Sequence, residues 1–399
     1  MRYDPWSPRF VADPYPAYEV LRREAPVFYH EPTDQWVISR HADVDALLRD
    51  RRLCRSYLHV ATHEEFGRTA EPEFLRPFWD LIRAGMLDVE PPAHTRLRRL
   101  VAKAFTARMV EGLRPMVRRL AEELAGGLVD KGAGDLLADV AEPLPVAVIA
   151  EMLGVPAADR HLLRPWSADI CGMYELNPAP AAQRAAVRAA VEFSAYLRDL
   201  TRARAADPRD DLISALAHVA DAGDRLTEDE LIGTCVLLLN AGHEATVNAT
   251  GNAWWSLLRN PGELARLRAD HTLIPSAVDE LLRYDTPAPM FERWVLADVE
   301  VAGRTIPRGS EVALQFASAN RDPAVFRAPD VLALTRDPNP HIAFGLGVHY
   351  CLGAPLARIE LAESFRALLR LAPRLEAAAE PPWKTGFVLR GLRALQVTV

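Results

Sequence analysis

The sequence lacks the features that mark several large classes of protein. No apolar run approaches the roughly 18–20 residues that a membrane-spanning helix needs, and the N-terminus has no apolar core of the kind found in signal peptides. The formal net charge is −7 over 399 residues, which argues against the basic surface that nucleic-acid binding requires. We therefore expect a cytoplasmic protein with no membrane partner and no nucleic-acid partner.

Cysteine is scarce and is not arranged in pairs. Four cysteines lie far apart in the chain, and no Cys-x-x-Cys motif occurs: Cys54, Cys171, Cys235 and Cys351. This spacing fits reduced thiols in a cytosol better than a disulfide framework. The absence of Cys-x-x-Cys-His excludes covalently attached c-type haem, and the absence of Gly-x-Ser-x-Gly argues against a Ser-His-Asp hydrolase.

The residues that are present favour a helix-rich domain. Hydrophobic residues make up 49% of the chain and charged residues 25%, so a substantial core can be buried. Helical patterns are found at residues 13–24, 42–50, 91–100, 109–204 (with breaks), 227–258, 276–284 and 354–371. Short strands are expected at 27–29, 36–39, 293–299 and 312–316, with a final hairpin around Arg390 and Gly391. Without linkers or repeats, residues 1–399 are expected to form a single, mainly α domain with small β-sheets (α+β).

Residues 55–89 show no clean period and contain bulky apolar side chains among prolines. A long irregular stretch inside a compact domain is uncommon and is often functional, for instance as a lid over a site. An ordinary surface excursion is the alternative interpretation.

The strongest chemical signal is the stretch Phe344-Gly-Leu-Gly-Val-His-Tyr-Cys351-Leu-Gly353. Its glycines allow a close approach of the backbone and permit positive φ. A helical pattern opens directly afterwards, so a thiolate here would lie among backbone N–H donors at the positive end of a helix dipole. Such a loop can present a soft axial ligand to a haem iron.

Two polar pairs are ambiguous when each is considered alone. His94 and Arg98 share one helix face and could bind a carboxylate or phosphate, or could form a solvated basic face. Glu280 and Arg283 can form an intrahelical pair, which on a surface is worth a few tenths of a kcal/mol.

The longest helix is predicted to begin at the capping box Thr227-Glu-Asp-Glu230 and to end near Leu258. Its middle is apolar on every side and is therefore expected to be buried. Asn240, Gly242 and Glu244 interrupt this apolar segment, although buried ionisable groups are costly unless they are paired or needed for chemistry. The pattern suggests a groove against the helix, or alternatively a structural carboxylate bonded to a neighbouring loop.

Taken together, these stretches resemble the cytochromes P-450, the haem-thiolate monooxygenases, in their soluble bacterial form. The resemblance covers essentially the whole chain. It implies a triangular, helix-rich domain with haem b between the long central helix and the helix after the cysteine loop. By this resemblance Cys351 is the axial ligand of the haem iron, and Phe344 packs near the thiolate. The other implied haem-binding residues are Gly345 and Gly353 of the loop, with His349, His94, Arg98 and Arg293 at the propionates.

The resemblance also implies a buried structural network of Glu280, Arg283 and Arg336 beneath the haem. The segment Ala241-Gly-His-Glu244-Ala-Thr246 matches the family's oxygen-activation segment, with one departure. The usual acid is followed directly by a threonine that helps to deliver protons, but here that position is Ala245. Thr246 comes one residue later, about 100° round the helix. Water or a substrate hydroxyl is the favoured replacement; Thr246 reaching through a distorted turn, or poor coupling with another oxidant, are the alternatives.

The electrons must come from outside the chain. Gly345-x-Gly347 is not a dinucleotide fingerprint, because the sixth position is Tyr350 and no strand-to-helix unit fits. The resemblance therefore implies O2 as a substrate and electrons from NAD(P)H, delivered by a ferredoxin or flavodoxin and its reductase to a monomeric enzyme. Candidate residues for a basic docking patch are Arg96, Arg99, Lys103 and Arg358, which could equally be idle surface charges.

The implied substrate pocket draws on four segments of the chain and suits a hydrophobic organic molecule. Its candidate residues are Phe78, Trp79 and Met86; Leu238, Leu239, Ala241 and Ala245; Ala288, Met290 and Phe291; and Phe387 and Val388. Each apolar residue could instead belong to the core.

Three other functions are weighed against this one. A zinc cluster of His341, His349 and Cys351 lacks a fourth ligand at a sensible spacing. A peroxide-driven haem enzyme is the closest rival, although the retained Glu244 favours dioxygen activation. A non-catalytic haem-fold module that recruits a partner protein is disfavoured by the intact cysteine loop.

Overall fold

The computed structural model describes residues 3–175, 177–221, 223–386 and 388–399. Its internal contacts divide the chain into two compact units. Unit 1 comprises Met1–Cys54, Val117–Leu144 and Ala245–Val399, and unit 2 comprises Arg55–Met116 and Pro145–Glu244. Each is described separately, and the expectation of a single domain stays a prediction. In the part of the chain described here, no helix has both the length and the apolar character needed to cross a membrane.

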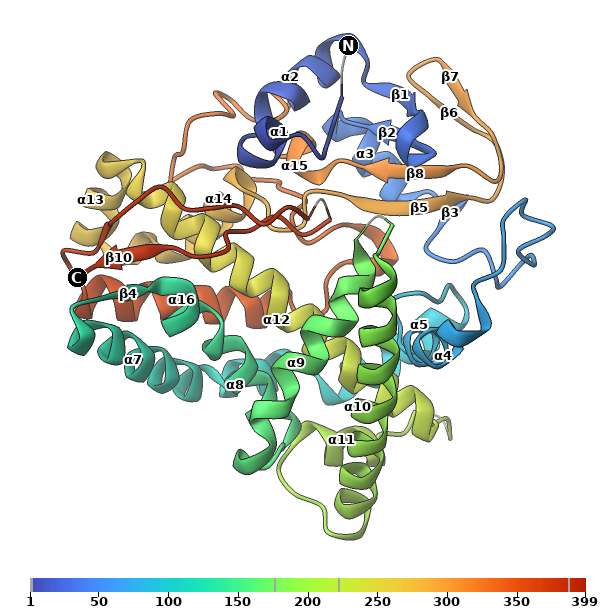
Figure 1. Cartoon of the computed structure of the whole chain (residues 1–399), viewed down its shortest axis with the longest axis horizontal. Coiled ribbons are helices and arrows are strands. Elements are labelled where there is room, and N and C mark those ends of the chain that lie inside the picture. The colour runs from blue at the N-terminus through green and yellow to red at the C-terminus, as the bar shows by residue number, and fades with distance from the viewer. Residues whose placement is uncertain (1–2, 176, 222, 387) are drawn as a thin grey trace. The chain divides into compact units, whose positions relative to one another are not determined.

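Unit 1 contains a five-stranded sheet in the order β1-β2-β8-β5-β3 (Figure 1). Its strands are β1 (Val27–His30), β2 (Gln35–Ile38), β3 (Leu53–Cys54), β5 (Phe291–Val295) and β8 (Glu311–Leu314). β2 and β8 pair in parallel and the other neighbours pair antiparallel. Alternate residues such as Val27, Ile38 and Val312 are buried in one hydrophobic cluster, as strand periodicity requires.

Two smaller sheets complete the strands of unit 1. A three-stranded sheet has the order β4-β10-β9, and β6 pairs with β7. These strands are β4 (Ala133–Asp135), β6 (Val299–Val301), β7 (Arg304–Ile306), β9 (Glu376–Ala377) and β10 (Gln396–Thr398). The notebook of sequence patterns contains no signal for β4, because three residues that include a glycine are too short to show a period.

The helices of unit 1 lie beside these sheets. They are α1 (Pro8–Ala12), α2 (Tyr15–Glu24), α3 (His41–Arg49), α13 (Pro261–Ala269), α14 (Ile274–Tyr284), α15 (Phe316–Ala319) and α16 (Ala354–Leu371). α15 packs against α2 and α3, and α14 packs against α16 (Figure 1). This second contact matters for the site because α14 carries the predicted ionic network and α16 follows the cysteine loop.

Unit 2 is helical. Its helices are α4 (Arg76–Ala84), α5 (Ala93–Ala104), α6 (Ala107–Gly112), α9 (Arg160–Cys171), α10 (Pro180–Ala206) and α11 (Leu212–His218). α10 packs against α4, α9 and α11, and α11 packs against α5. Three helices cross the division between the units: α7 (Arg114–Lys131), α8 (Pro143–Leu153) and α12 (Glu228–Leu258).

The long helix is confirmed as α12, with 31 residues. The predicted capping box is formed, because Thr227 N donates to Glu230 Oε2 at 2.8 Å and Glu230 N donates to Thr227 Oγ1 at 3.2 Å. Beyond the helix, the Asn260 amide donates to the Ser256 carbonyl at 2.8 Å.

Two expectations need correction. Residues 55–89 are not wholly irregular, because α4 occupies Arg76–Ala84. Phe78, Leu81 and Ile82 have helical spacing, but only over a little more than one turn, which is too short to stand out. The final hairpin is present, because Trp383 pairs with Leu392. Arg390 and Gly391 lie on its returning arm, and the predicted tip residue Phe387 lies outside the described residues.

Gly233 of α12 gives a test of this packing. A Cβ at Gly233 would lie 2.8 Å from the carbonyl carbon of Ala84 and from the amide nitrogen of Gly85, whereas a Cβ at Gly126 of α7 would meet no atom within 4 Å. We expect Gly233→Ala to lower the free energy of unfolding by about 1–3 kcal/mol through overpacking. Gly126→Ala should raise it by roughly 1 kcal/mol through helix propensity. Chemical denaturation measures both, and equal gains would contradict the packing.

Candidate active site

The cysteine loop is held in a conformation that depends on glycine. Gly345 and Gly347 have φ of 66° and 71°, in the left-handed region. Gly347 also lies against the carbonyl of Leu48, where any Cβ would collide with the backbone. The Cys351 amide donates to the Phe344 carbonyl at 3.0 Å and closes the loop. The half-buried Cys351 side chain is therefore placed by backbone geometry.

The N-terminus of α16 follows directly. Gly353 is its N-cap, and the Ala357 amide donates to the Gly353 carbonyl at 2.9 Å. A helix of 18 residues presents unsatisfied N–H groups and a partial positive charge at this end. The surroundings of Cys351 therefore favour a negatively charged ligand sulfur.

A second group of contacts braces the loop from the side of α14. The Arg358 guanidinium lies over the Phe344 ring, 4.5 Å from its centroid, and its Nε donates to Asp279 Oδ1 at 2.8 Å. His341 Nε2 is 3.2 Å from the same oxygen. Burial alone would raise the pKa of Asp279, but hydrogen bonds from His341 and Arg358 hold that pKa below its ordinary value. His341 is thus engaged with a carboxylate, which weighs against its use in a zinc cluster.

The structure brings Glu280, Arg283 and Arg336 together. Arg283, fully buried, donates to both carboxylate oxygens of Glu280 at 2.7 and 2.9 Å, and Arg336 Nε reaches them at 3.0 and 3.1 Å. The remaining donors of Arg283 bond the carbonyls of Asn320 and Pro329 at 2.8 and 2.9 Å. One buried carboxylate therefore balances two guanidinium groups and ties the segment 320–336 to α14.

The donor set around Cys351 was tested for its fit to haem. Over the described ranges, no three His, Cys, Asp or Glu residues gather closely enough to hold a metal ion. A single half-buried thiol suits a metal that brings four ligands of its own, as haem does. His349 is half-buried two residues before the cysteine, and Arg293 on β5 is 6% exposed. The residues of unit 1 fit the predicted group.

The oxygen-activation segment lies in an unbroken stretch of α12. Ala241 is exposed in the middle of this otherwise buried helix, and Glu244 and Ala245 are half-buried. Thr246 is 5% exposed, and its hydroxyl hydrogen-bonds the side chain of Glu360 on α16. The helix is not distorted here, so the Thr246 side chain is directed at Glu360.

Glu360 is a functional candidate that sequence reasoning missed. It is 2% exposed, and burial raises the pKa of its carboxyl to about 8, with the Thr246 hydroxyl lowering it in part. At neutral pH the carboxyl therefore holds a proton. In the sequence it reads as one acid among many in an amphipathic helix, so the signal was its place on the buried face of α16.

Unit 2 carries the other predicted haem-binding pair. His94 is 2% exposed and Arg98 is half-buried, one turn apart on α5. Their predicted role at the propionates stays a prediction.

The predicted docking residues are paired within each unit. Arg96 contacts Asp224 at 2.9 Å and Glu230 at 2.8 Å. Arg99 contacts Asp221 at 2.5 Å, and Lys103 also pairs with Asp221. The charge that these residues offer to an acidic partner is therefore smaller than the sequence suggests.

The predicted substrate residues differ in burial. Those that are buried are Phe78, Met86, Leu238, Leu239, Met290 and Val388, and those that are half-buried are Trp79, Ala288 and Phe291. Phe387 lies outside the described residues. The exposed Ala241 is the residue of this set whose burial sets it apart from core.

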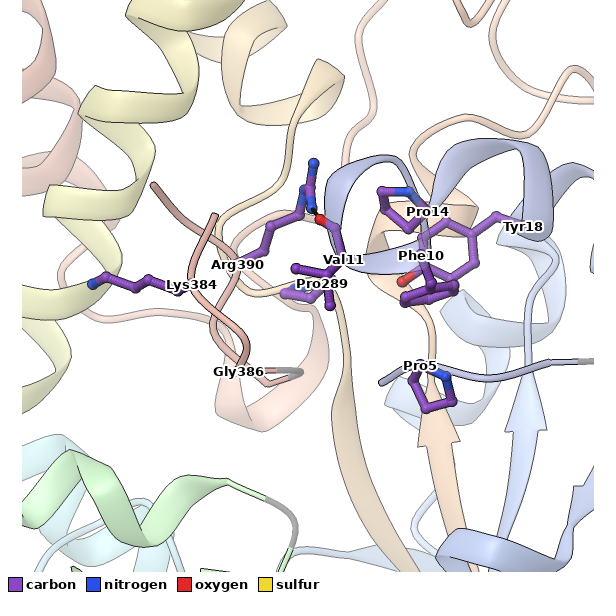
Figure 2. A pocket seen from close by; sticks show the side chains of 9 residues that line it. All are labelled: Pro5, Phe10, Val11, Pro14, Tyr18, Pro289, Lys384, Gly386 and Arg390. Carbon is purple, nitrogen blue, oxygen red and sulfur yellow. Dashed lines mark hydrogen bonds between the residues drawn. The ribbon is translucent and has the colours of Figure 1, made fainter. Parts of the chain in front are cut away.

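A small cleft in unit 1 lies elsewhere. Figure 2 shows it between the N-terminal segment and the final hairpin, lined by Phe10, Pro14, Tyr18, Lys384 and Arg390 among others. Lys384 is bonded to Asn248 at 3.0 Å and Arg390 to Asp285 at 2.9 Å. It contains none of the predicted substrate residues.

Comparison with known proteins places these features in one family. The family model described as Cytochrome P450 matches residues 178–371. Polyketide biosynthesis cytochrome P450 PksS of Bacillus subtilis (strain 168) is 36% identical, covering 100% of this chain and 99% of that protein. Cytochrome P450 monooxygenase PikC of Streptomyces venezuelae is 39% identical, covering 97% and 91%. The solved structure of P450BioI in complex with hexadec-9Z-enoic acid ligated acyl carrier protein has a TM-score of 0.91 at 34% identity, covering 98% and 100%.

The Glu360 carboxyl predicts a pH dependence of stability. Its folded-state pKa of about 8 exceeds its ordinary value of 4.5, so the proton stabilises the folded state fully below about pH 4.5. This contribution is lost as pH rises towards 8, by about 1.4 kcal/mol per pH unit. The free energy of unfolding of the unmodified protein, minus that of Glu360→Gln, should fall accordingly when denaturation is repeated across this range. A difference that does not change with pH would contradict the assignment.

Proposed function

Because the chain belongs to the cytochrome P450 family, we propose that it inserts one oxygen atom from O2 into a small hydrophobic organic molecule. As a member of this family it is an oxygen-incorporating oxidoreductase. The proposed reaction is hydroxylation or a related oxidation in natural-product metabolism or catabolism. The observation that carries the proposal is the placement of the Cys351 side chain by a glycine-dependent loop at the N-terminus of α16.

We assign the cofactor-binding roles as follows. Cys351 binds haem b as the axial thiolate, Phe344 shields the sulfur, and Gly345 and Gly353 give the loop its shape. Haem bound in this way supplies oxygen activation, because the thiolate donates electron density that favours cleavage of the O–O bond. The remaining residues orient the propionates: His349 and Arg293, with His94 and Arg98 on the strength of the resemblance alone.

Proton delivery is proposed to use the residues of α12 and α16. Glu244 is the acid of the oxygen-activation segment, and Ala245 leaves room for a water or a substrate hydroxyl in place of the usual threonine side chain. Glu360 holds a proton at neutral pH, and its hydrogen bond to the Thr246 hydroxyl gives that proton a route to α12. Thr246 therefore acts beside the water or substrate hydroxyl and does not replace it.

The partners are proposed at the level of class. A ferredoxin or flavodoxin with its reductase would supply electrons that originate from NAD(P)H. The names of relatives support an apolar natural-product substrate: one is a polyketide biosynthesis enzyme, and one structure holds a fatty-acid-loaded carrier protein. A peroxide-driven reaction is the rival.

Isotope labelling tests the reaction class. Compounds that shift the haem from low to high spin would be incubated with the enzyme, NADPH, a ferredoxin and its reductase under oxygen-18. Mass spectrometry should find one labelled oxygen atom in each product molecule. Product without the label would overturn the proposal, and equal product from hydrogen peroxide alone would favour the rival reaction.

Ala245→Thr tests proton delivery. The added hydroxyl and methyl groups occupy the space assigned to a water or substrate hydroxyl. Losing one such hydrogen bond costs about 1 kcal/mol, so product formed per NAD(P)H should fall roughly fivefold, with more peroxide released. Unchanged product yield and peroxide release on the true substrate would count against this account.

A further inference from the structure

The side chain of Asn240 on α12 is buried without compensation. It is 2% exposed, and within the described residues neither its amide nitrogen nor its amide oxygen has a hydrogen-bond partner. Leaving such a group unsatisfied costs roughly 1–3 kcal/mol. Leucine would fill the same place on an apolar helix at no such cost, so an asparagine here points to a ligand that satisfies the amide.

The neighbours of Asn240 in unit 2 are polar and come from separate segments. The Tyr174 hydroxyl lies near the Asn240 amide, close enough for the amide to lower the pKa of the phenol, but without good hydrogen-bond geometry. Burial raises that pKa well above its ordinary value, and the charges of Asp88 and Arg55 also act on it. Phenol, amide, carboxylate and guanidinium therefore gather in one region.

The charges in this cluster balance one another. Arg55 Nη2 and Asp88 Oδ1 are 3.0 Å apart, with 16% of each side chain exposed. The Arg55 backbone amide donates to Glu90 at 2.5 Å. A ligand meeting this pair finds no uncompensated charge from it, whereas the Asn240 amide still offers two donors and an acceptor.

The helix geometry places the amide along the oxygen-activation segment. Gly233 and Asn240 are seven residues apart and so lie on the same face of α12, since seven residues make almost two turns. Gly233 contacts the backbone of Ala84 and Gly85, which leads into the segment that holds Asp88. Glu244 follows Asn240 by four residues on this face.

We propose that Asn240, with Tyr174 and the Asp88–Arg55 pair, binds a neutral oxygen group of the substrate, a hydroxyl or a carbonyl. The proposal rests on the proposed monooxygenase function and narrows its substrate class to oxygenated apolar molecules. The amide nitrogen donates to a carbonyl or hydroxyl oxygen, and the amide oxygen accepts from a hydroxyl. A pure hydrocarbon would leave the amide unpaired and bind less tightly.

Matched probes test the proposal without knowledge of the natural substrate. The pairs are testosterone and androst-4-ene, cyclododecanone and cyclododecane, and 1-dodecanol and dodecane. Affinity is measured by the spin-state shift and, independently of haem, by the rise in melting temperature with probe concentration. For each protein the result is the ratio of the two affinities within a pair, which cancels the effect of the shared carbon skeleton.

Asn240→Leu is expected to lower this ratio about five- to tenfold for at least one pair, as loss of a buried hydrogen bond requires. Tyr174→Phe should lower it by a smaller factor. Thr234→Val is the matched control, because Thr234 is also buried on α12 with an unpartnered hydroxyl but lies about 120° away from Asn240. Its ratio should stay that of the unmodified protein.

The ligand-free Asn240→Leu protein should be at least as stable as the unmodified protein, since an apolar side chain removes the unsatisfied amide. The proposal is overturned if the unmodified protein prefers no oxygenated probe, or if Asn240→Leu keeps its ratio. Discrimination by melting temperature without labelled product would sink the monooxygenase function and leave the binding site standing.

Discussion

The position of one sulfur atom depends on a backbone that only glycine can adopt. Gly347 lies against the carbonyl of Leu48 at the end of α3, so any side chain there would push the cysteine loop away from the sheet. From this contact the chain passes through Cys351 directly into α16, which packs against α14. The ion pairs of Asp279 and Glu280 on α14 then fix the loop and the segment before it. The sheet and both helices thus act on a single ligand.

Polar side chains on α12 form the complementary part of the structure. Asn248 and Asn252 hold the returning arm of the final hairpin, through Lys384 and the Arg390 carbonyl. Thr246 bonds a carboxyl that keeps its proton at neutral pH. Asn240 has no such partner among the described residues. A helix whose polar groups are mostly satisfied therefore leaves one costly exception, in the region where a substrate is proposed to bind.

Local signals in the sequence predicted the elements with strong boundaries. The capping box and the long apolar period identified α12, and the loop after Phe344 identified the start of α16. Features that depend on distant contacts could not be predicted. α4 is too short to show a period, and the pairing of Lys103 with Asp221 joins residues 118 positions apart. Glu360 looks like any acid of a helix until burial and Thr246 are known. The pairing of Glu280 with Arg336 needed the family resemblance.

The central claim is that Cys351 binds haem as a thiolate, and the spectrum of the ferrous–CO complex tests it most directly. The reduced, CO-treated protein should show the red-shifted Soret band of a thiolate-bound haem, and Cys351→Ser should lose that band. Cys171→Ser, a change at another cysteine in unit 2, should keep it. A protein that takes up haem but shows no red-shifted band, or that keeps the band without Cys351, would contradict the account.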